Sequence, residues 1–388
     1  MNNNKSFHKH PISEALLKHR YGNYPDLSNV QRCLVIKFAH IGDVLLTTPV
    51  FRCLYEYFKD KEFEIDAMVY KKTEPLLRHN KFIKQIHIVD HHKSNQRRLS
   101  KEWNLLKAVR NRKYDLVLNM NSGDRGAISG FLSGAKIRVS LNPGNKGMYG
   151  KKKLSTHLIS YPIKPRHAVE RNLDFLRCIG IHPDVSQRQL YLDPGEKSRK
   201  SLYSKLKDYK IHAPNFSPVV ISPTTRWRFK SWRTDGFVDL IKYLNNNFGL
   251  PIVLVGGEEP LDFEISKEIV KNSAIEPLNL TGKTSLLELA ALLEKTKLFV
   301  GVDSAPMHMA STLKIPTIGI FGPTNAAEWA PWDNGDGFCK AVAMEEFSCL
   351  PCDLTGCGKG KVSDCLVQLP VERVIKAIND VVDLQVIT

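Results

Sequence analysis

The sequence predicts an α/β protein of two domains, each built on a parallel β-sheet that helices cover on both faces. The first observation is length, because 388 residues are too many for one ordinary domain and suit two. The second is the alternation of short apolar runs with segments of helical periodicity, which is typical of parallel sheets. The third is that several apolar runs end in glycine, hydroxyl or acidic residues, as strands do where ligands bind.

The first half of the chain opens with a polar arm over residues 1–31. This arm has charges but no apolar core, so it does not resemble a secretory signal. Buried-strand patterns and helical periodicity then alternate. They predict strands over 33–38, 65–70 and 115–120, and helices over 44–58, 101–113 and 166–180.

Residues 181–217 are rich in proline and poor in clear pattern, so we place the domain junction there. The predicted domains are 32–195 and 196–388. The alternation then restarts. It predicts strands over 218–222, 251–257, 298–302 and 317–322, and helices over 233–248, 260–271, 285–296, 304–313 and a last one near 370–383.

The net charge of +16 is unevenly distributed along the chain. Residues 1–180 hold 33 Lys and Arg against 15 Asp and Glu. A basic half indicates a polyanionic partner, either nucleic acid, an anionic membrane surface or a phosphorylated acceptor. The alternative is a solvated basic face kept for solubility. No apolar run is long enough for a transmembrane helix.

The stretch "FAHIGDVLLTTP" (38–49) joins the first predicted strand to its helix. Gly42 permits a tight turn, and Asp43 follows where the helix begins. One interpretation of Asp43 is an N-cap, a common use of aspartate. The other is a carboxylate placed to take a proton from an acceptor hydroxyl.

Two strand ends in the second half carry groups that suit phosphates and hydroxyls. "SPTTRWRFKSW" (222–232) presents Thr224, Thr225, Arg226 and Lys230, which suit phosphate oxygens unless this is an ordinary basic loop. In "LVGGEEP" (254–260), Glu258 or Glu259 can accept hydrogen bonds from ribose or sugar hydroxyls. That stretch lacks the full GxGxxG pattern of nicotinamide dinucleotide sites.

"FVGVDSAPMHMAS" (299–311) ends a third strand with an acid, a hydroxyl and a helix start. If Asp303 caps that helix, the amides of Ser304 and Ala305 point outward and favour an anion. His308 would face the same pocket, or else is a packed histidine on a buried helix. Together the three strand ends indicate a nucleotide-diphosphate ligand in the C-terminal domain.

Several blocks together resemble the ADP-heptose:lipopolysaccharide heptosyltransferases, glycosyltransferase family 9. They are "IGDVLLTTPVFRCL", "PTTRWRFKSW", "LVGGEE", "LTGKTSLLELAALL", "GVDSAPMHMASTLKIPTIGIFGPT" and "WAPW". The resemblance implies the GT-B fold, in which two Rossmann-like domains face each other across a cleft. Domain 32–195 would bind the acceptor and domain 196–388 the nucleotide sugar. Transfer would invert the anomeric carbon and need no metal.

The resemblance also assigns roles by position. Asp43 resembles the catalytic base, and Lys230 resembles the lysine that neutralises the donor phosphates, with Arg228 as the alternative. Glu259, or its neighbour Glu258, resembles the acid that holds the nucleoside. The remaining donor-binding positions are Thr224, Thr225, Arg226, Asp303, Ser304, Ala305 and His308.

The sequence is most similar to the subgroup that adds a branch heptose to the lipopolysaccharide inner core, while related enzymes heptosylate autotransporter proteins. The basic domain fits both a phosphorylated lipid core and the inner leaflet, so we expect a cytoplasmic enzyme peripheral to the inner membrane. Two other classes stay open. One is a non-hydrolysing nucleotide-sugar epimerase, and the other is a nucleic-acid-binding protein with a cysteine finger. The aromatic residues Phe38, Phe51 and Trp103 lie mostly in core-like patterns, which counts against the second class, so no nucleic acid is expected as partner.

Four cysteines cluster in "CLPCDLTGCGKGKVSDC" (349–365). Cys349, Cys352, Cys357 and Cys365 could close a tetrahedral site for structural zinc or iron. The alternative is four reduced cysteines in a loop, or one oxidised pair. Some family members of the autotransporter-modifying branch carry an iron-binding cysteine finger in this part of the chain.

Overall fold

The computed structural model describes residues 24–90, 97–160, 165–211, 215–358 and 360–382. The chain divides into two compact units, Met1–Tyr191 (unit 1) and Leu192–Thr388 (unit 2). Within the described residues, no helix combines the length and the apolar character needed to cross a membrane.

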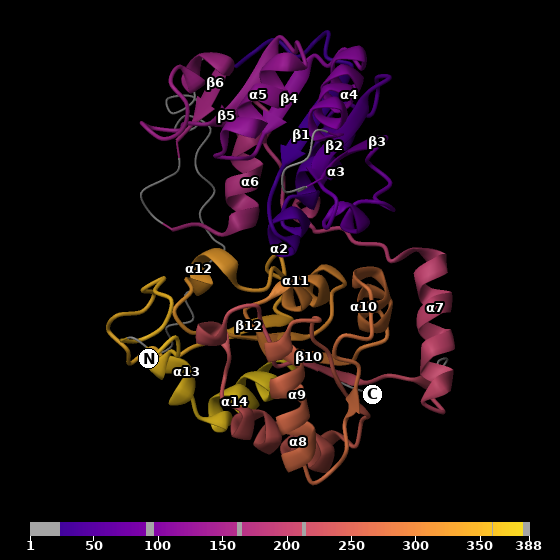
Figure 1. Cartoon of the computed structure of the whole chain (residues 1–388), viewed down its shortest axis with the longest axis vertical. Helices are drawn as coiled ribbons and strands as arrows, with labels where there is room; N and C mark the ends of the chain where they lie inside the picture. Colours follow the sequence, from indigo (N-terminus) through magenta and orange to yellow (C-terminus); the bar gives the residue numbers. More distant parts are fainter. Residues whose placement is uncertain (1–23, 91–96, 161–164, 212–214, 359, 383–388) are drawn as a thin grey trace. The chain divides into compact units, whose positions relative to one another are not determined.

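Unit 1 is built on a six-stranded parallel sheet in the order β3-β2-β1-β4-β5-β6 (Figure 1). The strands are β1 (Arg32–Lys37), β2 (Glu64–Tyr70), β3 (Gln85–Val89), β4 (Leu116–Asn119), β5 (Ile137–Leu141) and β6 (His157–Ile159). The helices are α2 (Ile41–Leu45), α3 (Thr48–Tyr57), α4 (Arg97–Asn111), α5 (Asp124–Leu132) and α6 (Ala168–Arg177), with 3₁₀ turns η1 (Glu74–Leu76), η2 (Lys151–Leu154) and η3 (Ser186–Arg188).

The helices of unit 1 cover both faces of its sheet. Val109 of α4 belongs to one buried cluster with Ile36 and Val117, and α5 packs on β1, β4 and β5. The connection from β1 to β2 moves across the sheet in the opposite direction from that between β4 and β5. Right-handed crossovers therefore place α3 on the other face, where it packs against α6.

Unit 2 repeats the same topology with the order β12-β11-β10-β7-β8-β9. Its strands are β7 (Val219–Ser222), β8 (Ile252–Leu254), β9 (Leu278–Asn279), β10 (Leu298–Val302), β11 (Thr317–Ile320) and β12 (Cys339–Val342). Its helices are α7 (Gly195–Asp208), α8 (Thr234–Phe248), α9 (Pro260–Asn272), α10 (Leu286–Leu293), α11 (Ala305–Thr312), α12 (Ala326–Trp329), α13 (Asp364–Val367) and α14 (Val371–Val382), with a 3₁₀ turn η5 (Arg228–Lys230).

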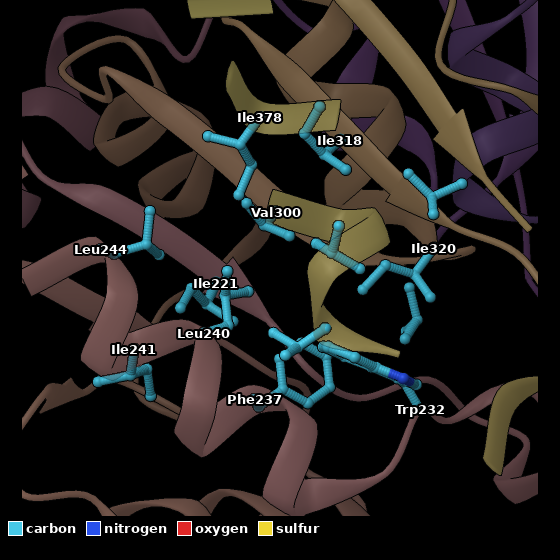
Figure 2. Packing of buried hydrophobic residues seen from close by; sticks show 14 of the residues in the cluster. Ile221, Trp232, Phe237, Leu240, Ile241, Leu244, Val300, Ile318, Ile320 and Ile378 are labelled. Carbon is cyan, nitrogen blue, oxygen red and sulfur yellow. The ribbon is translucent and has the colours of Figure 1, made fainter. Parts of the chain in front are cut away.

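The core of unit 2 lies between the sheet and α8, α9 and α14. Figure 2 shows strand residues such as Ile221 and Val300 facing the aromatic pair Trp232 and Phe237. The two rings meet edge to face with centroids 4.9 Å apart. The Trp232 indole N–H donates to the Leu369 carbonyl over 3.0 Å, so the buried polar atom of this side chain is satisfied.

The predicted α/β class is confirmed, since both sheets are parallel and doubly wound. One helix prediction was wrong, because 44–58 is two helices, α2 and α3. The hydroxyls of Thr47 and Thr48 donate to the carbonyls of Asp43 and Leu45, and Pro49 lacks an N–H. These side-chain bonds replace the helical ladder and end α2 there.

The sequence also missed several short elements and one long helix. In strands β3, β5, β6, β9 and β12, most residues are half-buried or exposed, so these strands lack the continuous buried pattern that marked the others. Helix α7 lies in the stretch that was interpreted as patternless. It buries only Gly195, Leu202 and Leu206, so its apolar periodicity is weak.

Candidate active site

Each sheet has a switch point in its strand order, where successive connections leave two neighbouring strands towards opposite edges of the sheet. It lies between β1 and β4 in unit 1 and between β7 and β10 in unit 2. In open parallel sheets, ligands bind outside the carboxyl ends of the strands at such points. Asp43 follows β1. Lys230 and Asp303 follow β7 and β10, so the predicted residues lie at both switch points.

An ion pair lies at the switch point of unit 2. Lys230 Nζ lies 2.7 Å from Asp303 Oδ2, although the residues are 73 positions apart in the chain. The Asp303 carboxylate is nearly buried and the Lys230 ammonium is about one quarter exposed. The pair joins the loop after β7 to the end of β10, as the predicted donor site requires.

The two other cations of the same loop are held elsewhere. Arg228 pairs with Glu264 of α9 at 2.5 Å, and both side chains are more than half exposed. The guanidinium of Arg226 lies 5.2 Å from the centroid of the Trp227 ring. Of the three cations, Lys230 is therefore the one that reaches the strand ends.

Buried hydroxyls line the same carboxyl edge. Thr224 and Thr225 are both buried, and a Cβ at Gly256 would lie 2.9 Å from Thr224 Oγ1 and 3.0 Å from Thr281 Cγ2. Among the described residues, the buried hydroxyls of Ser222 and Thr281 find no hydrogen-bond partner. A buried hydroxyl without a partner costs free energy, so these groups favour a polar ligand at this edge.

Sequence reasoning missed Thr281 as a site residue. It lies two residues after β9, a strand of two residues, so no strand pattern drew attention to it. The available signal was the hydroxyl followed by glycine in "LTGKT", since a hydroxyl just after a strand is also found in "SPTT" and "VDSAP".

The loop after β10 corrects one detail of the prediction. Ser304, rather than Asp303, is the N-cap of α11, and Pro306 lies in its first turn. The Asp303 amide donates to the Ile320 carbonyl over 3.1 Å, which makes Asp303 a continuation of the strand. Its carboxylate is therefore used by Lys230 instead of by the helix. His308 is buried on the same helix.

The acids after β8 mark the start of α9. Glu259 is the N-cap, and its amide donates to Asp262 Oδ2 over 3.1 Å. Glu258 and Glu259 are both exposed. Both therefore remain available to a ligand, and the choice between them stays a prediction.

In unit 1, Asp43 is the third residue of α2, whose N-cap is His40. Asp43 Oδ2 accepts a hydrogen bond from the His40 amide over 3.3 Å. The residue thus supports the start of the helix, as one interpretation expected, but not as the N-cap itself. Its side chain is only half-buried, so the helix role leaves it accessible to a reactant.

Sequence reasoning also missed a lysine beside Asp43. Lys37 ends β1, and its ammonium donates to Asn172 Oδ1 over 3.4 Å. Burial lowers the pKa of Lys37, while the Asp43 carboxylate acts in the opposite direction. Asn172 in turn donates to the Leu46 carbonyl over 2.9 Å. A lysine at a strand end resembles a solvated residue in sequence, so no pattern singled it out.

Asn121 fixes the strand ends at the switch point of unit 1. Its Oδ1 accepts from the Phe38 amide over 2.6 Å, and its Nδ2 donates to the Ile36 carbonyl over 3.0 Å. These two bonds tie the end of β1 to the segment after β4, which places the α2 turn and Asp43.

The four predicted metal ligands lie in one loop of unit 2. Burial raises the pKa of Cys365 to about 11, and the thiols of Cys357, Cys352 and Cys349 act in the same direction. Within the described part of the chain, however, no three or more His, Cys, Asp or Glu side chains are grouped to hold an ion. The other three thiols therefore influence Cys365 electrostatically, but among the described residues the four do not form a coordination site.

A pocket of about 370 Å³ lies elsewhere in unit 2. It is lined by α7 and by the loop after β9, including Lys205, Tyr209 and Lys283. None of its lining residues is a predicted donor residue. We therefore place the candidate site at the carboxyl ends of the strands of unit 2, which carry the ion pair and the buried hydroxyls.

Two doubly wound domains, one with a carboxylate and the other with a cation–acid pair at its switch point, have the architecture of two-domain glycosyltransferases. A family model described as glycosyltransferase family 9 (heptosyltransferase) matches residues 102–361. The chain belongs to this family and is a glycosyltransferase.

Individual relatives agree with this assignment. The chain is similar to lipopolysaccharide heptosyltransferase 3 of Escherichia coli, with 33% identity over 295 residues, covering 76% of this chain and 84% of that protein. A family 9 glycosyltransferase structure from Veillonella parvula has a TM-score of 0.74 at 22% identity, covering 90% of this chain and 97% of that one.

The structure of E. coli heptosyltransferase WaaC with ADP-2-deoxy-2-fluoro heptose has a TM-score of 0.63 at 19% identity, covering 90% of this chain and 99% of that one. The predicted GT-B fold class is thereby confirmed. Family membership also disfavours the epimerase and nucleic-acid-binding alternatives.

Proposed function

We propose that this enzyme is an inverting glycosyltransferase that moves heptose from ADP-heptose to an acceptor on the lipopolysaccharide inner core. The observation that carries the proposal is the Lys230–Asp303 pair at the switch point of unit 2, beside buried hydroxyls. A cation and an acid at one point match a donor that brings phosphates and sugar hydroxyls together.

In this proposal, unit 2 binds the donor. Lys230 neutralises the charge that grows on the diphosphate as ADP leaves, so the transfer needs no metal ion. Thr224 and Thr225 donate to phosphate oxygens, with Thr281 as an addition from the structure. Asp303 accepts from heptose hydroxyls, since a carboxylate beside phosphate would be repelled.

The remaining donor contacts follow the sequence-based assignment. The amides of Ser304 and Ala305 start α11 and favour negative charge, and His308 lies on that helix. Glu259 accepts from the nucleoside, and Arg226 supplies a second cation to the loop.

Asp43 of unit 1 acts as the general base that removes the proton from the acceptor hydroxyl. Lys37 is a positioning residue, because the chain of bonds through Asn172 fixes the end of α2.

A lipopolysaccharide acceptor is favoured over an autotransporter protein by the similarity to lipopolysaccharide heptosyltransferase 3. The basic first half of the chain suits phosphates on such a core and an anionic membrane surface. We therefore propose that the enzyme works in the cytoplasm, peripherally on the inner face of the inner membrane.

We also propose a structural zinc or iron ion at Cys349, Cys352, Cys357 and Cys365. Two contacts support the loop geometry. The Asp364 amide donates to Cys357 Sγ over 3.5 Å, and the Cys357 amide donates to the Val362 carbonyl over 2.6 Å. A bound ion would draw the four thiols together and fix the loop, with no position left for substrate.

The metal proposal is tested on protein made without a metal-affinity tag. Elemental analysis is expected to find about one equivalent of zinc or iron per chain. The double variant Cys349→Ser, Cys352→Ser should lose the ion and melt earlier. Wild-type protein that is isolated without metal, together with a variant that melts no earlier than it does, would contradict the assignment.

The proposed reaction is tested by incubating the enzyme with ADP-heptose and candidate acceptors. Release of ADP together with an acceptor mass increased by one heptose is expected for a heptose-deficient lipopolysaccharide core. The same increase on an autotransporter protein alone would move the enzyme to the protein-modifying branch. ADP release without any acceptor would contradict glycosyl transfer.

A further inference from the structure

The outer surface of α4 and α5 in unit 1 combines large exposed apolar side chains with cations. The two helices contact each other and run in the same direction, which an ion pair near their start and a close approach near their end indicate (Figure 1). Near the start, Arg125 of α5 pairs with Glu102 of α4. Near the end, a Cβ at Gly134 would lie 1.6 Å from Arg110 Nη1, so that guanidinium lies against the turn that follows α5.

Large apolar side chains are exposed on both helices. Trp103 of α4 is 70% exposed, so the prediction that it lies in a core-like pattern was wrong. Ile128, Phe131 and Leu132 of α5 are 38%, 48% and 41% exposed. Ile128, Phe131 and Leu132 have the spacing of one helix face. Both helices cover the same face of the sheet, so their outer stripes face the same side of unit 1.

Cations surround this apolar surface. Lys107 and Arg110 follow Trp103 on the same stripe of α4, and Lys136 is exposed just after α5. The Arg138 guanidinium lies 5.6 Å from the centroid of the Phe131 ring. Within the part of the chain that the structure describes, no acidic side chain pairs with any of these four cations. Glu102 is already held by Arg125.

We propose that this α4–α5 face docks the enzyme on an anionic phospholipid bilayer, an inference that rests on the proposed use of a membrane-borne acceptor. Exposed tryptophan and phenylalanine settle among lipid headgroups, where an aromatic ring meets both water and acyl chains. Lys107, Arg110 and Lys136 are exposed beside them and are attracted to anionic lipids, while Arg138 also donates to the Leu154 and Ala135 carbonyls. The α4–α5 face presents aromatic side chains and cations together.

The same surface is a poorer match for a second copy of the chain. A symmetric contact would bring the cations of one copy against those of the other, and like charges repel. An anionic bilayer supplies the opposite charge to all four cations. Charge complementarity therefore selects lipid as the occupant of this face.

The test is co-sedimentation of the full chain with vesicles of phosphatidylglycerol and phosphatidylethanolamine, compared with phosphatidylcholine alone. We expect binding to the anionic vesicles only, and weaker binding in high salt. The double variant Lys107→Glu, Lys136→Glu should bind at least about tenfold more weakly. Trp103→Ser, Phe131→Ser should weaken binding by a similar factor, about tenfold.

Matched controls separate this face from charge and apolarity in general. Lys197→Glu, Lys207→Glu makes the same charge change on exposed positions of α7. Val185→Ser removes an apolar side chain that is 58% exposed elsewhere in unit 1. Both controls should bind vesicles as the wild type does. ADP binding by every variant shows that the protein is folded and reports on the donor site independently of docking.

A second measurement asks whether the face enters the lipid. Vesicles with brominated acyl chains should quench the tryptophan fluorescence of the wild type, and Trp103→Phe should lose most of that quenching. Three results would overturn the inference: vesicle binding unchanged in both patch variants, an equal loss in the α7 control, or patch variants that break up an oligomer while still binding vesicles. Absence of heptose transfer would count against the proposed function and leave the vesicle result standing.

Discussion

At the scale of single residues, the candidate site is organised by which partner each charged side chain has found. Lys230 lies against Asp303, whereas Arg228 lies against Glu264 on the exposed side of α9. Lys37 lies near Asp43 and bonds to Asn172. These pairings give separate tests for residues that the sequence alone could not rank.

The first prediction concerns Asp43→Asn. We expect kcat to fall by about 10²–10⁴, the usual cost of losing a general base, while ADP-heptose binding stays as in the wild type. Steady-state kinetics and donor titration measure the two effects. Asparagine keeps a side-chain oxygen for the His40 amide, so the start of α2 should be preserved.

A matched control for this variant is Asp262→Asn. Asp262 holds the same position in α9 and accepts from the amide of its own N-cap over 3.1 Å. The variant Asp262→Asn should leave kcat nearly unchanged. If Asp43→Asn also turns over at a normal rate, Asp43 only supports its helix.

The second prediction separates Lys230 from Arg228. Lys230→Ala should weaken donor binding and lower kcat by about 10²–10³, because a preorganised charge at the leaving group is lost. Arg228→Ala should change the donor affinity and kcat by less than about threefold each, which is roughly what an exposed ion pair contributes. Isothermal titration with ADP and single-turnover rates distinguish the two. The opposite ranking would assign the phosphates to Arg228.

At the scale of elements, helix α8 is fitted to the sheet through one close approach. Gly236 in its first turn lies under the Trp232 ring, and a Cβ there would be 2.6 Å from the ring carbon Cζ2. The ring is rigid, and its N–H is engaged with Leu369, so it cannot move aside cheaply.

The third prediction follows from that contact. Gly236→Ala should destabilise unit 2 by about 1–3 kcal/mol, the usual cost of overpacking, even though alanine favours helices more than glycine does. Thermal unfolding measures the change. Gly123→Ala is the control, because a Cβ there meets nothing within 4 Å. A more stable Gly236→Ala would show that Trp232 repacks freely.

The elements also show how much of the fold could be predicted from the sequence. Strands with four or more buried residues, such as β1, β7 and β10, were predicted nearly to their bounds, and the polar residues after them mark the candidate site. What failed was either very short, such as β9, or depended on distant partners. Nothing in the local pattern says that Lys230 meets a carboxylate 73 positions away, or that Lys37 is held by Asn172.

At the scale of the whole molecule, the two units differ in how they bury charge. Unit 1 contains a buried network in which Arg112 and Tyr114 both donate to Asp66, and His87 Nε2 lies 2.7 Å from the Tyr114 hydroxyl. The pKa of His87 is lowered, first by burial and further by Arg112, with Asp66 opposing both. In unit 2, hydrogen bonds lower the pKa of Glu288 to about 2 despite its burial.

The fourth prediction is that unit 1 is the more acid-sensitive half. Unfolded histidine takes up a proton near pH 6.5, while native His87 resists protonation to a lower pH. Unit 1 therefore loses stability as pH falls below about 6.5, by at most about 1.4 kcal/mol per pH unit. Glu288 stabilises unit 2 above pH 4.5 and loses this only as pH approaches 2.

Calorimetry or limited proteolysis between pH 7 and 5 follows the two units separately. His87→Gln keeps an N–H donor for the Tyr114 oxygen without titrating, so it should flatten the loss in unit 1. His79→Gln, on the exposed surface of the same unit, should leave the slope as it is. An equal slope in both units would show that His87 does not govern acid stability.

The ion pair between Lys230 and Asp303 has a consequence for which anions this site binds well. An anion that binds Lys230 competes with Asp303 for the ammonium, and any weakening of the pair leaves a nearly buried carboxylate with less of its cation. Inorganic phosphate offers Lys230 a replacement but offers Asp303 only repulsion. A nucleotide sugar satisfies both sides of the exchange, with oxygens for the lysine and hydroxyls for the acid. On the proposed function, a donor that carries both the diphosphate and the heptose is therefore bound more tightly than its phosphate portion alone.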